Sequence, residues 1–105
     1  MIDVIGTDAG APASLPEMQQ RLIRTATLIA APRRLQPALQ SWLGSDRPLI
    51  CSDDPRSLAK TLAELDDQSD VVVLASGDPL WFGIGRILIE RLGSQRMRFH
   101  PSATA

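Results

Sequence analysis

The sequence of 105 residues predicts an α/β fold: an open, mainly parallel five-stranded sheet flanked by about four helices. Two observations predict it. Short apolar runs alternate with longer segments of helical periodicity, and the series starts and ends on a strand. The run Val71–Ala75 is apolar without a break, which is typical of a strand covered by helices on both faces. We expect right-handed βαβ units forming a single α/β domain over residues 1–105.

The first strand is predicted at Ile2–Ile5 and ends at Gly6, where a run of small residues begins. Ser14 can cap the helix that follows, with Pro16 and Glu17 in its first turn. The apolar stripe of this helix is expected at Leu15, Met18, Leu22 and Ala26.

A second strand is expected at Thr27–Ala31, where the residues are short, apolar and partly β-branched. Apolar residues from Leu35 to Leu43 then recur on one helical face. Pro37 lies near the start of this helix, where a missing N–H does least harm, and Gly44 ends it. Pro48–Ser52 is a third, weaker strand.

Asp53 or Asp54 can cap the third helix, whose buried stripe is expected at Leu58, Leu62 and Leu65. After the strand at Val71–Ala75, a fourth helix runs from about Ile84 to Gly93. The last strand is predicted at Met97–His100.

Composition excludes several classes of protein. The chain has 11 basic and 12 acidic residues and a net charge of −1, so we expect no nucleic-acid partner. It has no apolar run of about 18 residues and no basic leader, so we expect no membrane span or secretory signal. Cys51 is the only cysteine and is expected to be a small buried apolar residue. A cytoplasmic protein without a disulfide or metal site is therefore predicted.

Three segments follow strands and are rich in small residues: Gly6–Pro12, Ser76–Pro79 and Pro101–Ala105. Because ligands of open α/β sheets bind beyond the carboxyl ends of the strands, we expect the site there. The first segment lacks the glycine spacing of a dinucleotide site, and Asp8 would repel a pyrophosphate. A neutral or cationic ligand fits it better.

The segment around Gly77 and Asp78 has two interpretations. Asp78 can simply cap a helix that begins at Pro79. Alternatively, poor helix formers such as Gly83, beside the bulky Trp81, indicate a pocket wall against a flat ligand.

His100 is the only histidine and has no evident partner in the sequence. It is interpreted as a residue of the surface or of the strand end rather than as a general base. Arg86, Arg91, Arg96 and Arg98 are expected on a solvated face, with one or two able to meet carboxylates of an acidic substrate or partner. No catalytic acid, base or serine nucleophile is nominated.

The segment Val71–Gly85, with Ser-Gly-Asp-Pro followed by an aromatic pair and Gly-Ile-Gly, resembles the tetrapyrrole (corrin/porphyrin) methylases. It is most similar to the precorrin-6Y C5,15-methyltransferases of cobalamin synthesis. Gly6–Pro12, Arg33–Leu35 and Pro101–Ala105 resemble further segments of that family in the same order. Asp8, Ala9, Thr104 and Ala105 depart from its pattern.

The resemblance implies an enzyme that binds S-adenosylmethionine between two α/β subdomains and methylates a carbon of a precorrin. The positions that it implies on the cofactor side are Ala9, Gly77, Asp78, Trp81, Thr104 and Ala105. The reaction needs no covalent enzyme nucleophile, because placement of donor and acceptor and exclusion of water carry it.

The resemblance covers only the N-terminal subdomain of the family. We therefore expect an inactive fragment that binds S-adenosylmethionine weakly and presents an apolar patch, which favours a homodimer. A different class remains open: a non-catalytic binding module of the flavodoxin-like or receiver-like type, in which Asp8, Asp53 and Asp54 mimic an acidic cluster.

Overall fold

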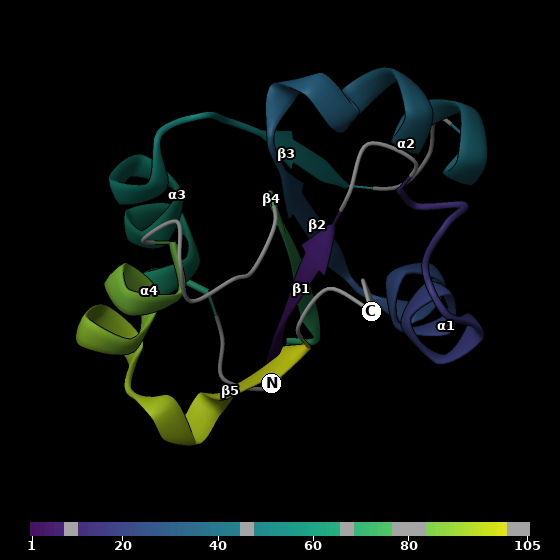
Figure 1. Ribbon diagram of the computed structural model, residues 1–105. Coiled ribbons are helices and arrows are strands. Elements are labelled where there is room, and N and C mark those ends of the chain that lie inside the picture. The colour runs from purple at the N-terminus through teal and green to yellow at the C-terminus, as the bar shows by residue number, and fades with distance from the viewer. Residues whose placement is uncertain (8–10, 45–47, 66–68, 77–83, 101–105) are drawn as a thin grey trace.

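The computed structural model describes residues 1–7, 11–44, 48–65, 69–76 and 84–100, which form a five-stranded sheet and the helices around it (Figure 1). The strands are β1 (Ile2–Thr7), β2 (Leu28–Ala31), β3 (Leu49–Cys51), β4 (Val71–Ser76) and β5 (Met97–His100). The α-helices are α1 (Glu17–Thr25), α2 (Gln36–Leu43), α3 (Pro55–Ala63) and α4 (Ile84–Leu92), with 3₁₀ turns η1 (Arg33–Leu35) and η2 (Ser94–Arg96). The predicted fold class is confirmed.

Every strand pair in the described part of the chain is parallel, and the strand order is β3-β2-β4-β1-β5. β1 and β4 lie together in the centre, with Ile2 level with Val71 and Thr7 level with Ser76. β5 pairs with the first part of β1, so that Ile5 is level with His100. The order differs from the 2-1-3-4-5 order of flavodoxin-like and receiver folds, so the interpretation as such a module is wrong.

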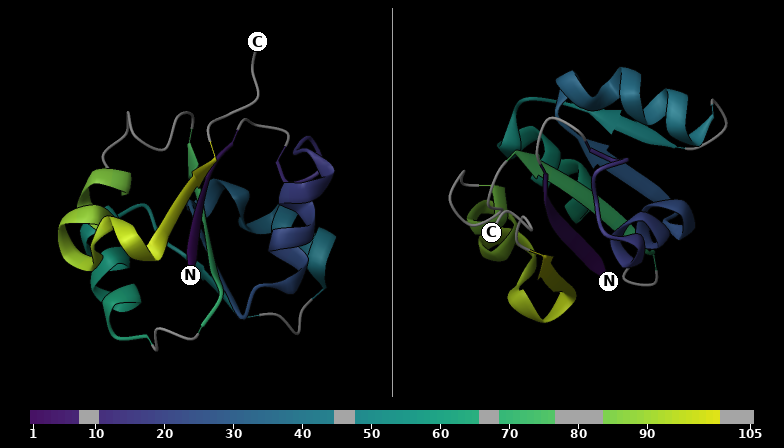
Figure 2. Two further views of the ribbon diagram at one scale, coloured as in Figure 1. Left: turned by 90° about the horizontal axis from the view of Figure 1, so that it is seen from below. Right: turned by 45° about the vertical axis from the view of Figure 1, so that its right-hand side comes forward.

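The sheet is the middle of three layers (Figure 2). Leu58, Leu62 and Leu88 from α3 and α4 pack on one face of the sheet, and Ile23 and Leu39 from α1 and α2 pack on the other. β4, the middle strand, contributes side chains to the cores on both faces, because successive side chains of a strand point to opposite faces. All of Val71–Ala75 is at most 3% exposed, as expected of a strand covered on both sides.

The start of α1 differs from its prediction. The helix begins at Glu17 and its N-cap residue is Pro16, so the assignment of Ser14 as the capping residue is wrong. The physical reason is Pro16, which disfavours a helical conformation at Leu15. Leu15 is buried, but it lies before the helix.

The buried stripe of α1 is also displaced from its prediction. Ile23 is fully buried, whereas Met18 is 73% exposed. These residues are five positions apart, which at 3.6 residues per turn puts them on nearly opposite sides of the helix. Leu22 and Ala26 do contribute to the core, so only the first turn of the predicted stripe is wrong.

The ends of the other helices follow the predicted signals. Gly44 and Gly93 end α2 and α4 with positive φ values of 86° and 83°, a region that favours glycine. Asp54 rather than Asp53 caps α3: its Oδ1 accepts hydrogen bonds from the backbone N–H groups of Arg56 and Ser57. Asp53 accepts one from the N–H of Arg33 instead. Asp53 and Asp54, two of the three carboxylates of the supposed acidic cluster, thus accept hydrogen bonds from backbone N–H groups.

Cys51 is only partly buried, which corrects its prediction as a buried residue. It ends β3, an edge strand, where one side of the strand has no neighbour within the described sheet. Burial, and then the charge of Asp53, raises the pKa of the Cys51 thiol above its ordinary value of 9.0. The thiol is therefore protonated near neutral pH.

Candidate ligand-binding edge of the sheet

The centre of the sheet contains a topological switch point. The chain leaves β1 for α1 on one face, and it leaves the adjacent β4 for α4 on the opposite face. In open α/β sheets, ligands bind beyond the carboxyl ends of strands at such a point, because the two connections leave for opposite faces of the sheet and a crevice forms between them. The fold therefore favours the ends of β1 and β4, the edge from which two of the predicted segments depart.

The described residues at this edge are small and uncharged. Gly6 is level with Ala75, and Thr7 is level with Ser76. The hydroxyl of Thr7 is buried and donates a hydrogen bond of 2.8 Å to the carbonyl oxygen of Ala75. This bond ties the ends of β1 and β4 together.

Four of the residues predicted to contact the cofactor follow β1 or β4 in the sequence, and the other two follow β5. They lie outside the described residues: Ala9, Gly77, Asp78, Trp81, Thr104 and Ala105. The structure describes the strands that lead into these segments, so their assignment stays a prediction.

A buried polar cluster joins β1 to β5 on the face covered by α1. The side chain of Asp3 is 6% exposed. Its Oδ1 accepts a hydrogen bond of 2.8 Å from Nε of Arg98, and its Oδ2 accepts one of 3.1 Å from Nη2. Hydrogen bonding to Asp3, and then the negative charge of the Asp3 carboxylate, raises the pKa of the Arg98 guanidinium. One predicted surface arginine thus pairs within the chain.

His100 belongs to the same cluster. Its Nε2 lies 2.9 Å from Oδ1 of Asp3, and its side chain is 21% exposed. Sequence reasoning found no partner for this histidine because the two residues are 97 positions apart. The available signal was a charged residue, Asp3, in an otherwise apolar first strand, where a carboxylate needs a partner when it is buried.

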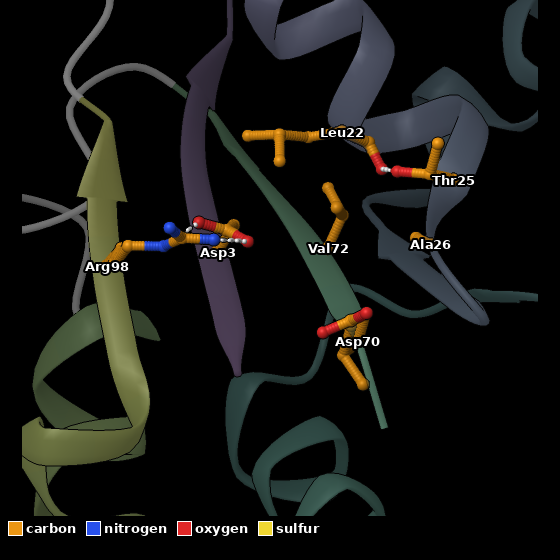
Figure 3. Close-up of a pocket in the computed structure, with 8 residues that line it drawn as sticks. Asp3, Leu22, Thr25, Ala26, Asp70, Val72 and Arg98 are labelled. Atoms are coloured by element: carbon orange, nitrogen blue, oxygen red, sulfur yellow. Dashed lines mark hydrogen bonds and ion pairs between the residues drawn. The ribbon is translucent and has the colours of Figure 1, made fainter. Parts of the chain in front are cut away.

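A small pocket lies near the amino ends of the strands, between α1, β4 and β5 (Figure 3). Asp3, Asp70 and Arg98 supply its polar lining, and Leu22, Ala26 and Val72 supply its apolar lining. Its volume is about 110 Å³. Ligand sites occupy about 300–1,000 Å³, so this pocket is too small for a nucleoside or a macrocycle.

Together, the parallel sheet with helices on both faces and the central switch point define a doubly wound α/β protein. A more particular assignment comes from comparison with known families. The family model of the tetrapyrrole (corrin/porphyrin) methylases matches residues 1–105, and the chain belongs to that family.

Relatives with names from one pathway cover the whole chain. A precorrin-6Y C(5,15)-methyltransferase [decarboxylating] of Sinorhizobium sp is 32% identical over 99% of the chain. One from Mycobacterium tuberculosis is 31% identical over all of it. A cobalt-precorrin-7 C(5)-methyltransferase of Salmonella typhimurium is 32% identical over all of it. The chain spans 25%, 26% and 51% of these relatives, respectively.

A solved structure supports the fold independently. The crystal structure of the methyltransferase CobJ matches 99% of the chain, and 46% of its own length, with a TM-score of 0.73 at 23% identity. At that identity, the likeness speaks for the architecture alone. Among the helices in the described residues, none is long and apolar enough to cross a membrane.

Proposed function

We propose that the protein to which this chain belongs is a methyltransferase that transfers a methyl group from S-adenosylmethionine to a carbon of a precorrin macrocycle. The observation that carries the proposal is the family match over residues 1–105 in a fold whose switch point lies between β1 and β4. The names of the relatives favour a substrate of the precorrin-6Y or cobalt-precorrin-7 kind. A cytoplasmic location and a homodimer are parts of the same proposal.

The described edge fits the proposed methyl donor. S-adenosylmethionine supplies a positively charged sulfonium whose methyl group is already electrophilic. The last residues of β1 and β4, Gly6, Thr7, Ala75 and Ser76, carry no positive charge that would repel it. The chain's task is then to bind, orient and exclude water, with main-chain groups close to the ligand.

The residues proposed to line the donor are Ala9, Gly77, Asp78, Trp81, Thr104 and Ala105. Asp78 would act mainly by shaping the segment after β4. A second α/β subdomain, contributed by sequence beyond this domain, would complete the site. The small fraction of each relative that the chain spans supports this division.

Two measurements test the proposal. The full-length protein is incubated with S-adenosylmethionine and either precorrin-6Y or cobalt-precorrin-7, and the products are analysed by mass spectrometry for added methyl groups. Methylation of one of the two is expected, and no methylation of either contradicts the proposal. In calorimetry, the isolated 105-residue chain should bind S-adenosylmethionine weakly. In the methylation assay, it should transfer no methyl group. Tight binding by the isolated chain would contradict the divided site.

Glycine variants test the edge after β4. Gly77→Leu adds a side chain where close approach of the main chain is proposed, so it should weaken S-adenosylmethionine binding about tenfold or more. Gly93→Ala is the matched control, because Gly93 ends α4 and a Cβ there meets nothing within 4 Å. Gly93→Ala should lower the stability somewhat, because alanine is disfavoured at the positive φ of this position, but it should leave the affinity for S-adenosylmethionine unchanged.

A further inference from the structure

Asp3 and His100 form a partly buried carboxylate–imidazole pair whose histidine lies at the carboxyl end of β5, level with Ile5 of β1. His100 is the last residue of β5, an edge strand that pairs with β1. We propose that His100 accepts the proton released during methyl transfer, and that Asp3 is the positioning residue that orients its ring. This inference rests on the proposed function.

The hydrogen bond selects the form of the imidazole. A carboxylate can only accept, so the proton of a neutral ring lies on Nε2, which faces Asp3 at 2.9 Å. The lone pair is then on Nδ1, across the ring from Nε2. Asp3 is level with Arg98, two residues closer to the amino end of β5 than His100. Nδ1 therefore points away from Asp3, on the side of the ring toward the carboxyl end.

The two charged residues of the cluster differ in exposure. The Asp3 side chain is 6% exposed, so its negative charge is little screened by water. Arg98 also pairs with Asp3, but its side chain is 56% exposed, and water screens its positive charge. An imidazolium formed at His100 during the reaction would lie against the Asp3 carboxylate, which is the place that the aspartate of a catalytic triad takes beside its histidine.

The proposed reaction requires such an acceptor. A carbon–carbon bond forms to the methyl group and the sulfur–carbon bond breaks, so one positive charge passes to the macrocycle. The macrocycle becomes neutral again when it releases one proton and keeps the bonding electron pair. Nδ1 of His100 takes this proton, and the imidazolium passes it to water through the exposed 21% of the side chain. General-base assistance of this kind contributes about 10²–10⁴ in rate.

The first test needs neither substrate nor turnover. Long-range ¹H–¹⁵N NMR of the histidine ring in the free protein should show the Nε2–H tautomer. Asp3→Asn, which replaces a pure acceptor with an amide, should abolish that preference, and Arg98→Lys should preserve it. An Nδ1–H tautomer in the native protein, or a tautomer unaffected by Asp3→Asn, would overturn the assignment of Asp3.

The second test separates a proton acceptor from a structural residue, using full-length protein, S-adenosylmethionine, and precorrin-6Y or cobalt-precorrin-7. His100→Ala should lower kcat by about 10²–10⁴, and imidazole added to the buffer should restore part of it. His100→Gln keeps an N–H donor for Asp3 but cannot take a proton, so its kcat should stay low. Both variants should keep the native Kd for S-adenosylmethionine. Arg91→Ala, an exposed change in the last turn of α4, is the control.

Native kcat in His100→Gln, or a loss in His100→Ala that imidazole does not restore, would overturn the proposal. So would a loss of affinity for S-adenosylmethionine as large as the loss of rate, because a structural role predicts it. If the native protein methylates neither precorrin, the proposed function itself fails and the role of His100 fails with it. The NMR measurement still reports on the Asp3–His100 pair in that case, so the two failures are distinguishable.

Discussion

Arg98 and Asp3 form a two-point ion pair across neighbouring strands in which the two partners differ sharply in exposure. The Asp3 side chain is 6% exposed and the Arg98 side chain is 56% exposed. Water can hydrate the exposed Arg98 when Asp3 is removed, whereas it cannot hydrate the buried Asp3 when Arg98 is removed. The pair should therefore respond asymmetrically to mutation.

Arg98→Ala should lower the free energy of unfolding by about 1–3 kcal/mol, because it removes two of the hydrogen bonds of a buried carboxylate. In the double variant Asp3→Ala/Arg98→Ala, the loss should be smaller than the sum of the two single losses. Urea denaturation of all four proteins measures the cycle. Strict additivity would show that the pair makes no net contribution.

Leu88 is fully buried where α4 packs beside α3 on the sheet. Leu88→Ala should destabilise the domain by about 2–5 kcal/mol through lost burial and the cavity it leaves. Met18→Ala is the control, because Met18 is 73% exposed, and it should stay within about 0.5 kcal/mol of the native protein. Similar unfolding midpoints for both variants would contradict the packing of α4.

Asp54 caps α3 with hydrogen bonds of 3.1 and 3.4 Å from the N–H groups of Arg56 and Ser57 to its Oδ1. Asp54→Ala should cost about 0.5–2 kcal/mol of stability. Asp54→Asn retains an accepting oxygen and should lose much less. Thermal unfolding compares the two, and equal losses would mean that the negative charge rather than the cap carries the effect.

The Cys51 thiol links stability to pH. Burial, and then the charge of Asp53, raises its pKa in the folded state above the ordinary 9.0, so the folded chain holds this proton more tightly than the unfolded chain. Its contribution is fully present below about pH 9 and is lost as the pH rises through the folded-state pKa.

Cys51→Ala should remove that part of the pH dependence. The test is the difference in unfolding free energy between the native protein and Cys51→Ala, measured by urea denaturation from about pH 7 to pH 10. Taking the difference cancels the titration of other groups. Asp53→Asn should shift the thiol titration to lower pH. A difference that stays constant across this range would contradict the raised pKa.

Much of the fold was predictable because its signals are local. The alternation of apolar runs and helical stripes predicted the order of the elements, and the unbroken run Val71–Ala75 predicted a strand buried on both faces. Gly44 and Gly93 marked helix ends through their backbone conformation. The assignments of Ser14 and Met18 failed because they depended on the first turn of one helix, which Pro16 delays.

Sequence alone therefore determined the class of fold, the family resemblance and the segments expected to meet a ligand, since each depends on residues close together in the chain. Only the tertiary structure decided the strand order, and with it the switch point between β1 and β4. It also decided that Asp3 meets Arg98 and His100, which lie 95 and 97 positions away. Those contacts arise because β5 pairs with the edge of β1 opposite to β4. No local pattern in the sequence encodes which strands become neighbours.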